Sequence, residues 1–322
     1  WDVGEETPRR YLHQRLNETV FQDLPGLMHN IERVIEHLDK KLTETDDREF
    51  RVLRLVPTTE GGNWVKGDSG AWRTYDFIEN TRSHDVCDGP DEAFEAARAF
   101  GRFQFHLKDM DVGELRETIP NFFSSPFRLH QFEEALAADP DGRSGGVGAE
   151  IRFVRERMGM VDVIESHLRA GRFPMRIVHG DTKLNNVLFD NDAGRAVSVV
   201  DLDTCMAGWT LYDFGDLVRF TAATSTEDEQ DLDQAGMNLE LYRALVDGFL
   251  AGADATLTPL ERKLMPFAAR LVTFTVGLRF LTDHIAGDVY FKTSRPDHNL
   301  DRARVQFRMV ERMEALEEQM GA

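Results

Sequence analysis

The feature that most constrains the fold is a strand-like stretch, Ile177–Asp203, inside a half of the chain that otherwise reads as helical. It runs IVHGDTKLNNVLFDNDAGRAVSVVDLD. Two apolar runs, Val187–Phe189 and Ala196–Val200, flank the turn sequence Asn-Asp-Ala-Gly, whose residues suit positive φ. This pattern predicts a β-hairpin. If the turn centres on those four residues, Asn186 faces Asp201 at the open end of the hairpin.

The same stretch carries side chains suited to phosphoryl transfer, which needs little covalent chemistry from a protein. Asn186 and Asp201 offer two neighbouring hard oxygen ligands, the kind that magnesium prefers. Asp181 lies in the loop before the hairpin and could accept the proton of an attacking hydroxyl. Lys183 could reach a transferring phosphate as a point charge. A second interpretation stays open, in which Asp181 and Asn186 only cap a polar turn before a structural hairpin.

The pattern H-G-D-x-K-x-x-N, followed by a hairpin and an Asp, resembles the catalytic loop of the protein-kinase-like small-molecule kinases. These include the aminoglycoside phosphotransferases and choline kinases. The kinase loop H-R-D-x-x-x-x-N has the same offset from Asp to Asn, here 186 − 181 = 5. The resemblance implies an α+β, bilobal protein-kinase-like fold. Residues 1–80 would form a small N-terminal lobe of antiparallel sheet plus helix, and residues 81–322 a mainly helical lobe that carries the catalytic hairpin.

A literal D-F-G at residues 213–215 is interpreted differently. In protein kinases this tripeptide carries the aspartate that holds magnesium. Here Asp213 follows Asp181 by 213 − 181 = 32 residues, and no strand precedes it. We therefore predict that Asp213 is the N-cap of a helix, with Asp216 at the third helical position near the positive end of the dipole.

Hydrophobic periodicity predicts the remaining elements. Strands are expected at residues 10–17, 51–57 and 71–78, with a turn at Gly4–Pro8 and a Gly-containing hairpin loop at 58–70. Helices are expected at Leu24–Leu42, Asp91–Leu107, Phe127–Ala138, Glu150–Ala170, Leu239–Leu250, Pro259–Ile285 and Leu300–Gln319. Residues 139–148 are predicted to be a flexible surface loop. The boundary between the lobes is expected near residues 79–89.

Composition excludes several classes of function. The chain has 322 residues and a formal net charge of −19, and it shows no basic face of the kind that binds extended nucleic acid. Cys87 and Cys205 form neither a zinc motif nor a disulfide framework, which suits a reducing compartment and a cytoplasmic location. The most apolar region, Phe267–Leu281, is interrupted by Arg270 and Arg279. We predict that it is too short and too charged to span a membrane.

Longer segments resemble a narrower family, the N-acetylhexosamine 1-kinases, which use ATP to phosphorylate the anomeric hydroxyl of N-acetylglucosamine or N-acetylgalactosamine. They read HGDTKLNNVLFD, VVDLDTCMAGWTLYDFGDLVRF, LVPTTEGGNWVKGDSGAWRTYDFIE and GLRFLTDHIAGDVYFKTSRPDHNL. Together with Tyr11–Leu38 they extend over nearly the whole chain. The resemblance implies ATP and Mg2+ as cofactors and a sugar as the small-molecule partner. It leaves the oligomeric state and the preferred sugar epimer undetermined.

The same resemblance implies roles for individual residues. Asp181 would be the base that activates the sugar 1-hydroxyl, and Asn186 and Asp201 would hold magnesium. Nucleotide binding would fall to the backbone of a hinge made of Phe77, Ile78, Glu79 and Asn80. Substrate binding would fall to Asp181, Arg279, Tyr290, Asp283 and Asp288.

Three further assignments follow from the residues themselves. Asp203 could orient the catalytic loop or touch the substrate. His179 is expected to pack and to form hydrogen bonds within that loop. An i,i+4 ion pair on a helix is an alternative for Arg279 and Asp283.

Two departures from the superfamily pattern concern the phosphates. No Gly-rich phosphate cover is visible, and we expect that segment to be disordered or absent from this chain. The strand position where protein kinases carry the V-A-I-K lysine is Gln14, while Arg15 should point to the other face of the strand. Phosphate neutralisation would then depend more on magnesium and Lys183.

Two alternative functions stay open. The first is the same chemistry on another hydroxyl, such as that of homoserine, choline, methylthioribose or an aminoglycoside. Positively charged substrates would predict an acidic pocket. The second is a non-catalytic, kinase-shaped binding protein, which Gln14 and the missing Gly-rich loop would suit. The presence of Asp181, Lys183, Asn186 and Asp201 together favours an enzyme.

Overall fold

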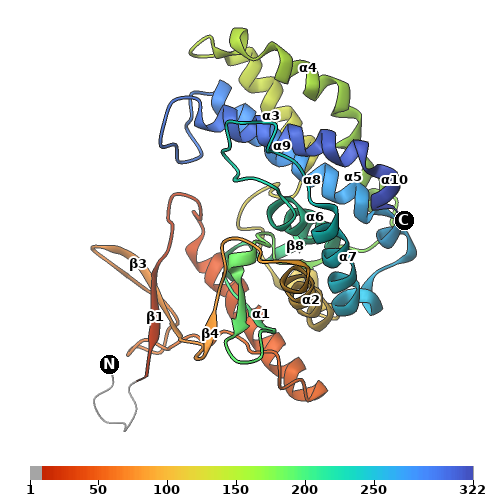
Figure 1. The fold of residues 1–322 in the computed structure, drawn as a ribbon. Helices are drawn as coiled ribbons and strands as arrows, with labels where there is room; N and C mark the ends of the chain where they lie inside the picture. The colour runs from red at the N-terminus through yellow and green to blue at the C-terminus, as the bar shows by residue number, and fades with distance from the viewer. Residues whose placement is uncertain (1–8, 322) are drawn as a thin grey trace. The chain divides into compact units, whose positions relative to one another are not determined.

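A computed structural model describes residues 9–321, apart from the side chain of Asp254 (Figure 1). The chain divides into two compact units. The first unit comprises the described residues up to 120 together with 175–210 and 248–256. The second comprises 121–174, 211–247 and the described residues from 257 onward. The predicted turn at Gly4–Pro8 lies outside the described residues. The predicted division into lobes at residue 80 stays a prediction.

The first unit opens with a three-stranded antiparallel sheet in the order β1-β3-β2. Its strands are β1 (Tyr11–Arg15), β2 (Val65–Gly67) and β3 (Gly70–Asp76). The strand expected at 51–57 is wrong, because that segment forms only a bridge from Leu55 to Tyr75. Val56 N–H donates to Thr74 O, but the ladder stops there, since Pro57 has no N–H to continue it.

Helix α1 (Leu24–Thr45) confirms the predicted amphipathic helix and extends it by one turn. Asp23 caps its first turn, accepting a hydrogen bond from Gly26 N at 2.9 Å. Its apolar positions are buried at helical spacing and pack toward α2 (Pro90–Leu107). These positions are Leu24, Leu27, Met28, Ile31, Val34 and Leu38. One of these two helices, α2, also contacts the start of the predicted catalytic loop, since its Phe100 and Phe103 pack on His179.

The predicted hairpin is present as β6 (Val187–Asp190) and β7 (Ala196–Val199), and β4 (Thr81–Arg82) adds a third strand beside β6. Its register differs from the prediction. Val187 pairs with Val199, and a bulge follows Leu188. The side chain of Asp190 accepts hydrogen bonds from two turn amides, which tightens the turn and shifts the pairing. Residue 186 therefore lies beside residue 200 rather than 201.

From residue 125 onward the chain is mainly helical. The helices are α3 (Ser125–Ala138), α4 (Gly148–Arg157), α5 (Val163–Arg169), α6 (Thr210–Thr221), α7 (Leu239–Ala253), α8 (Pro259–Ile285), α9 (His298–Ala315) and α10 (Glu317–Met320). In the second unit α8 packs against both α3 and α9. The single helix predicted at 150–170 is broken at the 3-10 turn Met158–Met160, where Gly159 weakens the helix. The loop predicted at 139–148 contains a second 3-10 turn, Arg143–Gly146.

The predicted helix cap at Asp213 is wrong. Helix α6 begins at Thr210, directly after β8 (Met206–Gly208) and Trp209, so Asp213 lies within the first turn. Its residue is fully buried, and it remains a structural rather than a metal-binding candidate. Asp216 lies further along α6 and forms an ion pair with Arg219 at 2.9 Å.

Helix α8 differs from its prediction in how apolar it is. By length and composition, Pro259–Ile285 is apolar enough to cross a membrane, contrary to the prediction from its two arginines. However, 72% of its apolar window is buried inside the structure. Packing against α3 and α9 accounts for that burial within the second unit, which is the behaviour of a core helix.

Candidate active site

The predicted catalytic loop begins at His179, directly after β5 (Arg176–Val178), and this histidine is fully buried. Its ring packs edge-on against Phe100 and Phe103 of α2, with centroids 5.3 and 5.6 Å away. Its Nε2 lies 2.9 Å from Val200 O, and Asp181 N–H donates to Nδ1 at 3.3 Å. His179 therefore joins the start of the loop to the end of β7, as a packing and hydrogen-bonding residue.

The structure brings Asp181, Lys183 and Asn186 together. Lys183 Nζ lies 2.8 Å from Asp181 Oδ1 and 3.1 Å from Oδ2. Asn186 Nδ2 donates to Asp181 O at 2.8 Å and to its Oδ2 at 3.3 Å. The Asp181 side chain is 26% exposed, whereas Asn186 is buried. The carboxylate is thus held by a cation and an amide while one part of it faces solvent.

Asp201 lies just past the end of β7 in a left-handed conformation, with φ of 64°. Aspartate adopts this conformation more readily than most residues, and such backbone conformations concentrate at functional sites. Val200 N–H donates to Asn186 O at 2.9 Å, which brings the backbones of Asn186 and Asp201 to the same end of the hairpin.

The donor set at this end of the hairpin fits magnesium. One amide and one carboxylate are hard oxygen ligands, and magnesium usually takes only one or two such groups alongside substrate phosphates. Within residues 9–321, no group of three or more His, Cys, Asp and Glu side chains is placed to hold a metal ion. Asn186 and Asp201 stay the predicted residues that would hold magnesium, on the chemistry of their oxygens alone.

Asp203 lies in the 3-10 turn Leu202–Thr204 that follows Asp201, and it has a partner that the sequence did not reveal. Arg73 Nη2 of β3 lies 2.6 Å from Asp203 Oδ1. Burial raises the pKa of the Asp203 carboxyl above its ordinary value; Arg73 opposes this shift and the charge of Asp201 reinforces it. The only signal for Arg73 in the sequence was its place on the inward face of a predicted strand.

The predicted hinge, Phe77–Asn80, connects β3 to β4 and is held at several points. Phe77 N–H donates to Arg10 O at 3.1 Å, and the Arg10 guanidinium lies 4.0 Å from the Phe77 ring centroid. The carbonyl of Glu79 accepts from Arg51 Nη1 at 3.0 Å. These contacts fix the hinge backbone, and its role in binding adenine stays a prediction.

Three of the predicted substrate residues of the second unit, Arg279, Asp283 and Tyr290, line a pocket of about 440 Å³, whereas Asp288 is not among its lining residues. Arg279 of α8 lies at its wall, with its guanidinium 5.7 Å from the Tyr290 ring and 5.2 Å from the Phe291 ring. A third ring, Phe122, is 5.6 Å away. Tyr290 is 58% exposed and therefore lies at the rim. Aromatic faces thus hold the Arg279 cation in the pocket.

Asp283 and Asp288 shape this pocket. Asp283 is buried and accepts hydrogen bonds from the backbone N–H groups of Val289, Tyr290 and Phe291 at 2.8–3.0 Å. Among the described residues Asp283 forms no ion pair with Arg279, so the alternative of an i,i+4 pair is wrong. Asp288, with φ of 60°, accepts from Asn299 Nδ2 at 2.8 Å and pairs with Arg143. The two carboxylates anchor the loop that carries Tyr290.

A second arginine in this pocket was missed by the sequence analysis. Arg128 of α3 lines the cavity with Arg279, and its Nε is buried without a hydrogen-bond partner. Burial, together with the charge of Arg279, lowers the pKa of Arg128 to about 10. Its periodic position on α3 gave no sign of this role, because only tertiary packing brings α3 beside α8.

Comparison with known proteins is consistent with this geometry. The model of the family described as APH, Phosphotransferase enzyme family, matches residues 27–247 of the chain. An aminoglycoside phosphotransferase from Alicyclobacillus acidocaldarius is 14% identical, with a TM-score of 0.61, over 97% of this chain and 87% of that one. A microcompartment-associated aminopropanol kinase is 17% identical, with a TM-score of 0.58, over 97% and 87%.

A third similar structure was solved with ligands. Amicoumacin kinase hAmiN, in complex with AMP-PNP, Ca2+ and Ami, is 15% identical with a TM-score of 0.56. The likeness covers 93% of this chain and 80% of that one. At these identities, the three structures establish the protein-kinase-like α+β fold for this chain.

Proposed function

Because the chain belongs to the Phosphotransferase enzyme family, we propose that it is an ATP-dependent small-molecule kinase that phosphorylates the anomeric hydroxyl of an N-acetylhexosamine. The product is the sugar 1-phosphate. Asp181, Lys183 and Asn186 support the phosphotransfer chemistry, since the side chains of Lys183 and Asn186 both lie within hydrogen-bond distance of the Asp181 carboxylate. The two free cysteines suit the reducing cytoplasm, which is where we expect the enzyme to act.

The proposed reaction is a single displacement at phosphorus. The 1-hydroxyl oxygen of the sugar attacks the γ-phosphorus of ATP, and its proton passes to a carboxylate oxygen of Asp181. The bond from the γ-phosphorus to its bridging oxygen breaks, and ADP leaves. Lys183, next to Asp181, places a positive charge where the transferring group gathers negative charge. Magnesium bound to Asn186 and Asp201 would supply further neutralisation of the phosphate oxygens.

The observation that carries the choice of substrate is the charge of the pocket in the second unit. It contains two arginines, Arg128 and Arg279, and its two acids do not offset them. Asp283 is already occupied by backbone donors, and Glu134 is exposed and pairs with His130 at 3.4 Å. A cationic substrate would meet two guanidinium groups here, and the described lining residues offer it no available buried carboxylate.

An N-acetylhexosamine suits this lining better. Its acetamido carbonyl and ring hydroxyls can accept hydrogen bonds from guanidinium groups, and its apolar ring face can pack on Tyr290. Methylthioribose is less favoured because it lacks the acetamido carbonyl, and homoserine is less favoured because its ammonium group would find no available buried carboxylate among the described lining residues. Choline and aminoglycosides are disfavoured by their positive charge.

The experiment that tests the proposal is an ATP-consumption assay with a substrate panel. We expect turnover with N-acetylglucosamine or N-acetylgalactosamine, and none with choline or an aminoglycoside. The matched control is 1-deoxy-N-acetylglucosamine, which retains the acetamido group but lacks the hydroxyl that is phosphorylated. If a cationic substrate is turned over and no amino sugar is, the proposed substrate class is wrong. Magnesium-dependent ATP binding without any turnover would favour the non-catalytic alternative.

The arginine pair gives a second expected result. Arg279→Met keeps the length of the side chain but removes its donors, so we expect kcat/KM for the sugar to fall about 10- to 100-fold. Arg128→Gln should lower it to a similar extent. The KM for ATP should stay unchanged in both variants, as measured by initial rates. Arg155→Gln, an exposed arginine on α4, is the matched control and should behave as wild type.

An unchanged KM for the sugar in both Arg279→Met and Arg128→Gln would show that this pocket does not bind the substrate. In that case the phosphotransfer chemistry at Asp181 would still stand, and only the substrate assignment would fail.

A further inference from the structure

A buried arginine lies on the inner face of the first sheet. Arg73 is 3% exposed, and Gln14 stands opposite it in the pairing of β1 with β3. Gln14 Oε1 accepts hydrogen bonds from Arg73 Nε and Nη2 at 3.2 and 3.0 Å. Arg73 Nη2 also lies 2.6 Å from Asp203 Oδ1. One guanidinium is therefore fixed between a strand amide and a carboxylate that follows the hairpin.

Three polar atoms around this guanidinium are buried without a hydrogen-bond partner. They are Arg73 Nη1, Tyr75 Oη and Asp203 Oδ1. The contact of Asp203 Oδ1 with Arg73 is an ion pair that lacks the alignment of a hydrogen bond. The guanidinium lies 5.1 Å from the Tyr75 ring centroid, so the three atoms belong to one cluster. Buried polar groups are almost always satisfied, and the two donors among these atoms, Arg73 Nη1 and Tyr75 Oη, indicate a position that a ligand with acceptor oxygens completes.

The neighbouring groups indicate the chemistry of that ligand. Asp201, the proposed metal ligand, precedes Asp203 by two residues. Burial raises the pKa of Tyr75, and the negative charge of Asp201 raises it further, which indicates that Asp201 lies near this cluster. A ligand that meets both a magnesium ion and guanidinium donors through its oxygens is a polyphosphate. Arginine suits this contact, since its planar fork can donate two parallel hydrogen bonds to one phosphate.

We propose that Arg73 is the strand-borne cation that binds the nucleotide phosphates, and that Gln14 is the positioning residue that orients it. Gln14 occupies the strand position where protein kinases carry lysine, and it has no charge. The cation comes instead from the adjacent strand, directly opposite. Asp203 neutralises Arg73 in the absence of nucleotide, and phosphate oxygens take its donors when nucleotide binds. The inference rests on the proposed ATP-dependent function.

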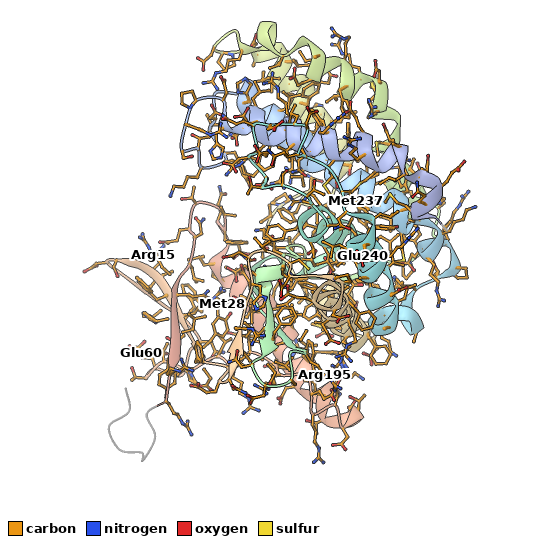
Figure 2. All side chains as sticks on the ribbon, in the orientation of Figure 1. Arg15, Met28, Glu60, Arg195, Met237 and Glu240 are labelled. Carbon is orange, nitrogen blue, oxygen red and sulfur yellow. The ribbon has the colours of Figure 1, made fainter. Side chains whose placement is uncertain are left out.

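Calorimetric titration with adenosine, AMP, ADP and ATP in the presence of Mg2+ tests this assignment. Arg73→Gln is expected to weaken ATP and ADP binding about 10- to 100-fold and to leave adenosine binding at the wild-type level. Arg73→Lys should recover part of the loss, because it restores the charge but not the fork. Gln14→Ala should raise the KM for ATP with little change in kcat. Arg15→Gln, which changes an exposed residue of β1 labelled in Figure 2, is the matched control and should bind ATP as wild type does.

A purely structural role for Arg73, as the counter-charge of Asp203, gives a different result in the double variant Arg73→Gln/Asp203→Asn. Removing both charges would then restore the melting temperature and the ATP affinity together. Our assignment expects the melting temperature to recover while ATP affinity stays low. Full recovery of ATP affinity in the double variant, or wild-type ATP affinity in both Arg73→Gln and Arg73→Lys, overturns it.

The same titrations separate this inference from the proposed function. A wild-type protein that neither binds ATP nor transfers phosphate would remove both. A wild-type protein that phosphorylates the sugar while Arg73→Gln retains its ATP affinity would remove only the assignment of Arg73.

Discussion

Replacing Asp181 by Asn is expected to lower kcat by about 10²- to 10⁴-fold while leaving the affinity for ATP nearly unchanged. An amide has the shape of the carboxylate but cannot accept the proton of the attacking hydroxyl. The hydrogen bond from Asn186 Nδ2 to the Asp181 carbonyl, at 2.8 Å, does not depend on the side chain, so the loop should keep its conformation. Initial rates and ATP titrations measure the two effects separately.

The matched control is Asp68→Asn, which removes one carboxylate from the exposed turn between β2 and β3. It should retain wild-type kcat. An Asp181→Asn variant that kept full activity would contradict the role of Asp181 as the base. It would then favour an interpretation in which this carboxylate only shapes the loop.

Changing Asp201 is expected to have the second large effect. Asp201→Asn tolerates the left-handed backbone but removes the charge, so we expect turnover to fall at least about 100-fold at fixed magnesium. Asp201→Ala should abolish turnover, with an added cost of about 1–2 kcal/mol for an alanine at φ of 64°. Turnover measured against magnesium concentration should show a weakened metal dependence in Asp201→Asn.

Asp213, the aspartate of the D-F-G sequence, provides the contrast. It is fully buried in α6, so Asp213→Asn should lower the free energy of unfolding by about 1–3 kcal/mol. The folded fraction of this variant should keep the wild-type dependence on magnesium. The reverse result, with Asp213 controlling magnesium and Asp201 only stability, would show that the metal assignment is wrong.

Local sequence signals predicted much of the catalytic stretch. The turn between two apolar runs identified the hairpin, and the spacing of Asp181 and Asn186 was enough to place them in one loop. The register was wrong by one residue because Asp190 bonds to the amides of its own turn and tightens it. Side-chain capping of this kind is not visible in hydrophobic alternation.

Features that depend on tertiary packing were not predicted. Arg73 and Arg128 each lie beside a residue that is distant in the sequence. Arg73 forms an ion pair with Asp203, which follows the hairpin, and Arg128 lines a pocket with Arg279 of α8. The alternation of Ala71, Arg73 and Tyr75 on β3 was the one local signal, since a charged residue stands at an inward position. The start of α6 was misplaced because the short strand β8 before it has no clear apolar pattern.

The central claim is that this protein transfers a phosphoryl group from ATP to the anomeric oxygen of an N-acetylhexosamine. The most direct test is NMR of the product formed by the wild-type protein from ATP, Mg2+ and N-acetylglucosamine or N-acetylgalactosamine. Our account expects a new phosphorus signal coupled to the anomeric proton, and none with the 1-deoxy sugar. A phosphorus signal coupled to the protons at another carbon, or no phosphorylated sugar from either substrate, would contradict it.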